Sequence, residues 1–253
     1  MAILHKEIED ILTQIPTKIE SVAVITGAGI SQESGIPTFR GGDGLWKQYK
    51  PEELATPYAF RKDPKLVWEW YEMRRQIIKK ANPNPAHYTL VEMEEFFENF
   101  LLVTQNVDGL HEKAGSKNII EIHGNIWRAR CTNCNYKEFL NTPLQEIPPR
   151  CINCNSLMRP DVLWFGENYE VETLSIVQEF FQKVALLFVI GSSGQVSVPV
   201  YLAKEAHLNG AIVIEINPDF SSYSHFADFI LRYKAAESLP VLWKYLKEYL
   251  QKN

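Results

Sequence analysis

The chain has 253 residues, of which 45% are hydrophobic and 12% aromatic, so it can bury a sizeable core and is not an intrinsically disordered protein. Its 26 Lys and Arg residues against 31 Asp and Glu residues give a net charge of -5, which argues against nucleic acid as a partner. No segment approaches the roughly 20 uninterrupted apolar residues of a membrane-spanning helix, and the N-terminus has no signal-peptide core, so we expect a cytoplasmic protein without membrane contact. We also expect a monomer.

Six short apolar runs predict the strands of a parallel sheet. Their Val, Ile and Leu residues do not alternate with polar ones, which indicates that both faces of each strand are covered. The runs occupy residues 22–26, 100–104, 119–122, 185–190, 211–216 and 229–231. Helical stretches at residues 171–183 and 199–208 lie between the later runs. The alternation predicts a Rossmann-like, doubly wound α/β domain formed by residues 1–36, 100–126 and 161–253.

The first strand runs into a glycine-bearing turn, Gly-Ala-Gly-Ile-Ser at residues 27–31, which we expect to open a helix. Glycines let backbone amides approach a pyrophosphate, and a helix N-terminus offers unpaired N–H groups. Gln32 stands where the dinucleotide fingerprint has its third glycine. The turn therefore indicates nucleotide binding, with a tight strand-to-helix connection as the alternative.

Two segments interrupt the strand-helix alternation. Residues 37–99 hold no convincing strand but carry helical runs at residues 64–80 and 86–98, so they predict a helical insertion. Residues 127–160 contain all four cysteines and little periodicity. This second segment has too few apolar residues to form a stable core alone. It therefore predicts a small module that is stabilised by a bound metal.

The cysteines form two CxxC pairs separated by sixteen residues, and these pairs are Cys131 with Cys134 and Cys151 with Cys154. Each pair can place two thiolates on one tetrahedral ion, and the spacing is typical of a zinc ribbon. Four thiolates complete the coordination shell, so we expect one structural zinc ion and no catalytic metal. A pair of redox dithiols is the alternative.

Polar residues follow two of the predicted strands. TQNVDGLH occupies residues 104–111, and a histidine follows the next strand. Ligands of open α/β sheets bind beyond the carboxyl ends of the strands, so these side chains are expected to converge on one crevice. They are Gln105, Asn106, Asp108 and His123. A histidine there can act as general base near neutral pH; the alternatives are a packed or surface histidine and, for Asp108, a simple turn residue.

Taken in order along the chain, these motifs resemble those of the sirtuin family. They are GAGIS at residues 27–31, SGIPTFRG at 34–41, TQNVDGLH at 104–111, HG at 123–124, the paired CxxC motifs, FGE at 165–167 and IN at 216–217. The resemblance extends from about residue 20 to about residue 245. It implies a domain that binds NAD in a crevice, with the helical insertion and the zinc module as the opposite wall.

The resemblance also implies which residues contact NAD and the substrate. The residues expected to bind NAD are Gly27, Ala28, Gly29, Ser31, Thr38, Phe39, Arg40, Trp46, Gln105, Asn106, Val107, Asp108, Gly191, Ser192, Ser193, Asn217, Pro218, Ala235 and Ala236. The residues expected to clamp an extended acyl-lysine peptide of a protein, as an added strand, are Phe165, Gly166, Glu167 and Val196.

The implied activity is NAD-dependent removal of acyl groups from protein lysines. The acyl-lysine amide oxygen attacks the nicotinamide ribose, and His123 then acts as general base on a ribose hydroxyl, with Asn106 and Asp108 as further catalytic residues. The products are free lysine, nicotinamide and O-acyl-ADP-ribose. The alternatives are a mono-ADP-ribosyltransferase with the same pocket and a module that binds NAD or acyl-lysine without turnover.

Tyr71 and Arg74, three residues apart in a predicted helix, project from one helical face. An arginine fork matches a carboxylate, and a tyrosine hydroxyl can add a third contact. A subset of sirtuins that removes succinyl, malonyl and glutaryl groups is similar in carrying this Tyr-x-x-Arg pair in its acyl pocket. The alternative from the residues alone is that Arg74 and Arg75 solvate an exposed face while Tyr71 packs inward.

Several positions depart from the sirtuin pattern. Tyr233 and Ala236 stand where a glycine-rich segment is expected, so they can reshape the adenine pocket. Residues 191–199 are one residue longer than the family's glycine-to-proline spacing, and Pro51 replaces a small residue beside the acyl pocket. The changes at Tyr233, Ala236 and residues 191–199 do not touch the implied chemistry, whereas Pro51 bears on the capacity of the pocket for longer acyl chains.

Overall fold

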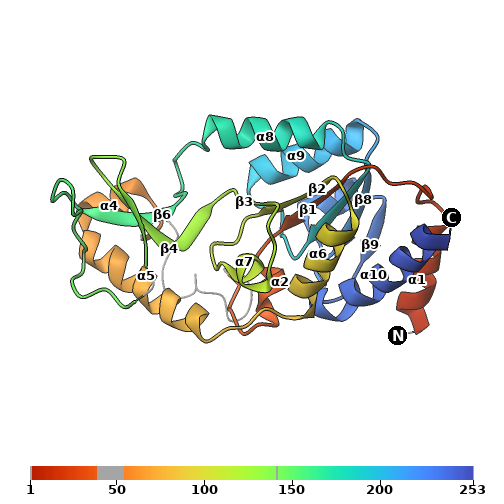
Figure 1. Cartoon of the computed structure of the whole chain (residues 1–253), viewed down its shortest axis with the longest axis horizontal. Coiled ribbons are helices and arrows are strands. Elements are labelled where there is room, and N and C mark those ends of the chain that lie inside the picture. The colour runs from red at the N-terminus through yellow and green to blue at the C-terminus, as the bar shows by residue number, and fades with distance from the viewer. Residues whose placement is uncertain (1, 39–53, 141, 253) are drawn as a thin grey trace.

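A sheet of six parallel strands forms the centre of the computed structural model, which describes residues 2–38, 54–140 and 142–252 (Figure 1). The strands are β1 (Val22–Thr26), β2 (Phe100–Thr104), β3 (Ile119–Glu121), β7 (Leu186–Ile190), β8 (Ile212–Ile216) and β9 (Phe229–Leu231). Their order is β3-β2-β1-β7-β8-β9, so the winding reverses between β1 and β7. The predicted doubly wound α/β fold is confirmed.

Helices cover both faces of this sheet. Successive side chains of a strand point to opposite faces, so each strand contributes to two cores. In β1, Val22 and Val24 belong to one core, whereas Ala23 and Ile25 belong to another. The first core lies beneath α1 (Ala2–Leu12), α6 (Pro85–Phe96) and α10 (Ala235–Lys252), and the second beneath α8 (Val171–Phe181) and α9 (Ser197–Leu208). Burial on both faces explains why β1 is apolar throughout.

The helix α6 starts at a capped proline. Asn84 accepts the amide of Ala86 at 3.0 Å, and Pro85 fills the first helical position, where no N–H partner is needed. The boundary drawn from the sequence places this helix in the insertion of residues 37–99. Its residues Leu90 and Met93 pack in the same core as the six-stranded sheet. The helix α6 therefore belongs to the lobe formed around that sheet, the large lobe.

Among the described residues, a second, small lobe combines two helices with a three-stranded antiparallel sheet (Figure 1). Its elements are α4 (Pro57–Lys62), α5 (Pro64–Lys79), β4 (Gly124–Cys131), β5 (Lys137–Phe139) and β6 (Met158–Val162), in the sheet order β5-β4-β6. Trp68 of α5 donates to the carbonyl of Met158 at 2.8 Å, and both belong to a core that also contains Cys131 and Cys151. The helical insertion and the cysteine module therefore share one core.

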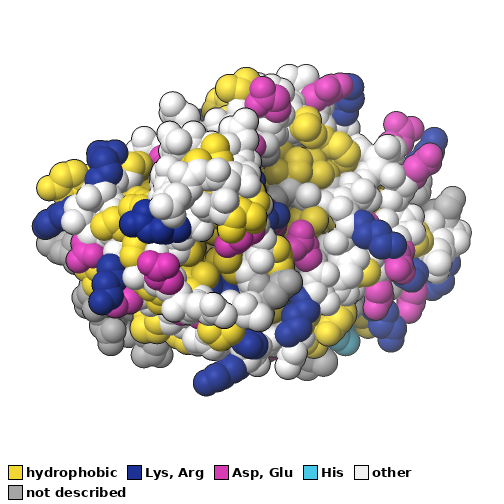
Figure 2. All heavy atoms as spheres, turned by 60° about the vertical axis from the view of Figure 1, so that its left-hand side comes forward, with side chains coloured by type: hydrophobic (Ala, Val, Ile, Leu, Met, Phe, Trp, Pro, Cys, Tyr) yellow, Lys and Arg dark blue, Asp and Glu magenta, His cyan; other side chains and the backbone are white. Residues whose placement is uncertain are grey.

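Charge is evenly mixed on the face drawn in Figure 2, where Lys and Arg side chains alternate with Asp and Glu side chains. This distribution agrees with the small net charge of the chain, -5. Within the described ranges, none of the helices combines the length and the apolar character that crossing a bilayer requires.

Candidate functional site

Two glycine turns meet at the switch point between β1 and β7. The Gly27 amide donates to the Ile190 carbonyl at 3.0 Å, and the Gly29 amide donates to the Gly191 carbonyl at 2.9 Å. A β-carbon on Gly29 would lie 2.7 Å from Gly191 Cα, and Gly191 itself has a φ of +60°. Side chains cannot fit there, so glycines let the two turns pack closely at the point where open α/β sheets bind their ligands.

A cleft of about 780 Å³ opens at this switch point and runs between the two lobes. It is lined by most of the side chains that the sequence predicts for the site. These residues are Gly27, Ala28, Gly29, Thr38, Tyr71, Arg74, Gln105, Asn106, Val107, His123, Phe165, Gly166, Glu167, Gly191, Ser192, Ser193, Val196, Asn217, Pro218 and Ala235. The topology thus brings the ends of the parallel strands β1, β2, β3, β7 and β8 and the face of α5 to one cavity.

Three other predicted residues lie close to this cleft. Ser31 and Asp108 line a small adjoining cavity of about 30 Å³, which shares Arg74 and Asn106 with the main cleft. Ala236 follows the lining residue Ala235, and its amide donates to Glu33 Oε2 at 2.8 Å. Phe39, Arg40, Trp46 and Pro51 lie outside the described residues.

A buried network fixes the polar groups of this adjoining cavity. Ser31 Oγ donates to Asp108 Oδ2 at 2.8 Å, and Leu110 of α7 (Leu110–Ala114) donates its amide to Asp108 Oδ1 at 2.9 Å. Asn106 Nδ2 donates to the Gly27 carbonyl at 3.1 Å. Burial raises the pKa of Asp108, while the hydrogen bonds from Leu110 and Ser31 and the charge of Arg74 act in the opposite direction. Asp108 is therefore more than an exposed turn residue.

His123 lies in the turn between β3 and β4 and is half-buried. Its Nδ1 lies 3.0 Å from the Gln105 carbonyl, which can only accept, so Nδ1 carries the proton and Nε2 presents a lone pair. Burial lowers the pKa of His123 below its ordinary value, against a smaller effect of the Gln105 hydrogen bond. The ring is therefore neutral at pH 7, which is the state that a general base needs.

Tyr169 is a lining residue that the sequence analysis missed. Its hydroxyl lies 3.0 Å from His123 Nε2. Its position two residues after Glu167 was the one available signal. Trp164 was also missed, although its indole nitrogen donates to the Tyr71 hydroxyl at 2.9 Å inside the cleft.

The face of α5 toward the cleft carries Tyr71 and Arg74, with exposed fractions of 1% and 6%. The Arg74 guanidinium lies over the Trp70 ring at 4.7 Å from its centroid. Burial lowers the pKa of Arg74, opposed by Tyr71 and Asp108. The alternative in which Arg74 and Arg75 solvate an exposed face is wrong, because both are buried.

The loop between β6 and α8 is anchored through Glu167. Arg159 Nη2 donates to Glu167 Oε2 at 3.0 Å, and the Trp164 amide donates to the same oxygen at 2.8 Å. Burial tends to raise the pKa of Glu167, but these hydrogen bonds hold it below its ordinary value. The carboxylate therefore fixes the loop that carries Phe165 and Gly166 at the rim of the cleft.

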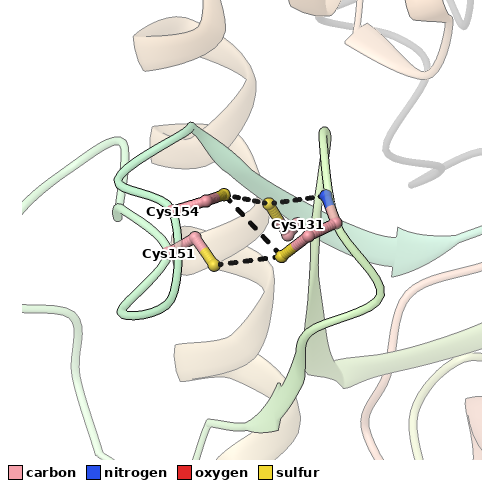
Figure 3. A group of neighbouring side chains, drawn as sticks. Cys131, Cys151 and Cys154 are labelled. Atoms are coloured by element: carbon pink, nitrogen blue, oxygen red, sulfur yellow. Dashed lines mark hydrogen bonds between the residues drawn. The ribbon is translucent and has the colours of Figure 1, made fainter.

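The four cysteine sulfurs lie within 4.8 Å of one another, and three of the side chains are labelled in Figure 3, where they converge from two turns. The Cys131–Cys154 and Cys134–Cys151 Sγ distances are 3.5 Å and 3.6 Å, too long for disulfides. Zn–S bonds of about 2.3 Å in a tetrahedron place sulfurs about 3.8 Å apart. The four cysteines fit a structural zinc site, in which the protein fills all four ligand positions. They do not fit a catalytic zinc site, which keeps one position open.

Comparison with known proteins agrees with this geometry. Residues 27–198 match the model of the Sir2 family. The chain is 52% identical over 229 residues to an NAD-dependent protein deacylase of Aquifex aeolicus, covering 90% of this chain and 96% of the relative. A similarly named protein of Leptospira interrogans is 51% identical over 236 residues, covering 92% and 96%.

Among solved structures, a Sir2 homolog–NAD complex superposes with a TM-score of 0.89 at 42% identity and covers 96% of this chain and 94% of that one. The region matched by the Sir2 family model, residues 27–198, includes the glycine turn, the polar segment after β2, His123, the four cysteines and the Phe165–Glu167 loop. The chain belongs to the Sir2 family.

Proposed function

We propose that this protein is an NAD-dependent protein lysine deacylase. The observation that carries the proposal is the geometry of His123, whose Nδ1 is bound to the Gln105 carbonyl and whose Nε2 faces a cleft that the glycine turns of β1 and β7 also line. The names of its relatives support the same activity. We also propose that it acts as a monomer in the cytoplasm, where reducing conditions keep the four thiols available to metal.

The fit of the cleft supports the placement of NAD. Gly27, Gly29 and Gly191 line the cleft without side chains, so a pyrophosphate could approach the backbone there. Ser192 is held by Gln105 Nε2 at 2.9 Å, and its carbonyl accepts from Asn217 Nδ2 at 2.9 Å, which fixes a polar wall for the adenosine half. Bound NAD would supply an electrophilic ribose carbon and a ribose hydroxyl that accepts the acyl group.

The residues of the chain then bind, orient and move one proton. Asn106 would contact the nicotinamide end in the main cleft, with Asp108 and Ser31 behind it in the small adjoining cavity. His123 Nε2 would take the proton of the ribose hydroxyl, because its other nitrogen is already committed to the Gln105 carbonyl. The Phe165–Glu167 loop and Val196 would pair with the backbone of the acylated substrate protein.

We further propose that the acyl pocket accepts short dicarboxylic acyl groups, succinyl and malonyl, as well as acetyl. Arg74 is a buried cation that lines the cleft, and Tyr71 lies one helical turn before it. A carboxylate at the end of an acyl chain would supply the charge that such an arginine favours. The cysteines would hold one zinc ion, which supports the fold and takes no part in the reaction.

Mass spectrometry of one peptide sequence, acetylated or succinylated on a single lysine and incubated with NAD, tests this function. We expect free lysine, nicotinamide and O-acyl-ADP-ribose, with no product when NAD is left out. Transfer of ADP-ribose to a protein or peptide with the acyl-lysine intact would instead identify a mono-ADP-ribosyltransferase. Binding of NAD without any product would identify a non-catalytic module.

A further inference from the structure

Tyr169 stands directly against the proposed base, in the segment between β6 and α8. Its hydroxyl lies 3.0 Å from His123 Nε2, and the two rings are 5.8 Å apart at 41°. The tyrosine ring packs against the core beneath α8 and α9, whereas its hydroxyl end lines the cleft. The hydroxyl is thus held at the reacting nitrogen by a ring that is anchored elsewhere.

The direction of this hydrogen bond follows from the other side of the imidazole. The Gln105 carbonyl fixes the proton on Nδ1, so Nε2 accepts and the Tyr169 hydroxyl donates. A ring nitrogen has a single lone pair in the ring plane. While Tyr169 donates to it, a ribose hydroxyl cannot donate to the same lone pair.

We propose that Tyr169 caps His123, so that binding of NAD must break the tyrosine-histidine hydrogen bond before the ribose hydroxyl can reach Nε2. The proposal rests on the proposed function, since it needs NAD as the ligand and His123 as the base. Tyr169 is then a residue that sets the affinity for NAD: the cleft binds the cofactor more weakly than its contacts alone would allow.

A relay through Tyr169 is the competing arrangement. In a relay the phenol gives its proton to Nε2 while it takes the proton of the ribose hydroxyl. Burial raises the pKa of Tyr169 to about 12, which makes the phenol a poor proton donor to a histidine whose own pKa burial lowers. Loss of the hydroxyl would lower kcat if the hydroxyl relays a proton, whereas it would tighten NAD binding if the hydroxyl is displaced.

The Tyr169→Phe variant removes the hydroxyl and keeps the ring in its place. Calorimetric titration with NAD alone should show a dissociation constant about two- to tenfold lower than that of the unchanged protein, the net value of one intramolecular hydrogen bond. The KM for NAD should fall in step. Tyr201→Phe is the matched control: Tyr201 is 53% exposed on α9, so loss of its hydroxyl should leave NAD affinity unchanged.

A double-mutant cycle with His123→Ala separates the cap from other effects of the tyrosine. Without the imidazole there is no hydrogen bond to break, so Tyr169→Phe should then leave the NAD dissociation constant unchanged. Unchanged affinity in the single variant, or a fall in kcat with unchanged affinity, would overturn the cap. If the unchanged protein neither binds NAD nor deacylates, the proposed function itself fails, independently of Tyr169.

Discussion

At the scale of single residues, the neutral ring of His123 is set by burial and by one acceptor, the Gln105 carbonyl. Replacing His123 with Ala should leave the fold and NAD binding in place but slow deacylation by roughly 10²- to 10⁴-fold, the usual loss of a general base. Steady-state kinetics on an acetylated peptide, with circular dichroism as the folding check, measure this. Turnover close to normal would mean that another group takes the proton.

The acyl preference depends on Arg74. An Arg74→Met variant would leave a substrate carboxylate buried without its partner, at a cost of roughly 2 to 5 kcal/mol. At about 1.4 kcal/mol per factor of ten, kcat/KM for a succinylated peptide should fall about 30-fold to a few thousandfold. Removal of acetyl, which places only a methyl group there, should be kept or improve.

The neighbouring arginine provides the control for that experiment. Arg75 is equally buried, but its Nη2 donates to the Leu140 carbonyl at 2.6 Å and so serves the small lobe. Arg75→Met should lower stability and affect both acyl groups alike. An equal loss on both peptides in Arg74→Met would assign Arg74 to the fold or to NAD.

Contacts between side chains distant in sequence are what a single sequence predicts least. Tyr169 and His123 are 46 positions apart, and Trp164 and Tyr71 are 93 positions apart. No periodicity or spacing links such pairs, because the loops that bring them together are set by tertiary packing. Gln105 and Asn106, by contrast, follow a strand directly, and the sheet topology alone places them at the crevice.

At the scale of elements, the apolar runs predicted all six strands of the large sheet to within one residue at each end. Burial on both faces makes such strands continuous in apolar character, which is a strong local signal. The packing of α6 was not predictable in the same way. Its periodicity reveals an apolar face but not which lobe that face covers.

Two buried histidines near the start of α6 should make the free energy of unfolding depend on pH. His87 packs on His111 of α7 with ring centroids 4.8 Å apart, and burial lowers the pKa of His87 to about 4. Burial, and then the nearby His87, lowers the pKa of His111. The unfolded chain takes up these protons below about pH 6.5 and the folded one does not, so stability should fall as the pH drops from 6.5 toward 4.

Urea unfolding at a series of pH values measures this dependence. Each such histidine should contribute a slope of about 1.4 kcal/mol per pH unit within that window. His87→Gln should reduce the slope by about 1.4 kcal/mol per pH unit, which corresponds to one proton. The control is His225→Gln, which removes a histidine at an exposed position. A slope that His87→Gln leaves unaltered would show that other groups govern acid unfolding.

At the scale of the whole molecule, the small lobe depends on its four cysteines. Freshly purified protein should contain one equivalent of zinc by elemental analysis, because the four cysteines offer a complete set of ligands for one tetrahedral ion. Cys151→Ser should lower the melting temperature and the activity together, since metal binding contributes directly to the free energy of folding. Protein that is free of zinc yet equally stable would contradict this role.

The core shared by α5 and the cysteine module has a consequence for thermodynamic linkage. Trp68 and Arg75 fasten α5 to the Met158 and Leu140 carbonyls of that module, and the same helix presents Arg74 to the cleft. Release of the metal that weakens these two hydrogen bonds would also make the position of α5, and with it the acyl pocket, less well defined. Reciprocity then requires that an acylated peptide which tightens α5 raise the affinity for the metal by the same factor by which the metal raises the affinity for the peptide.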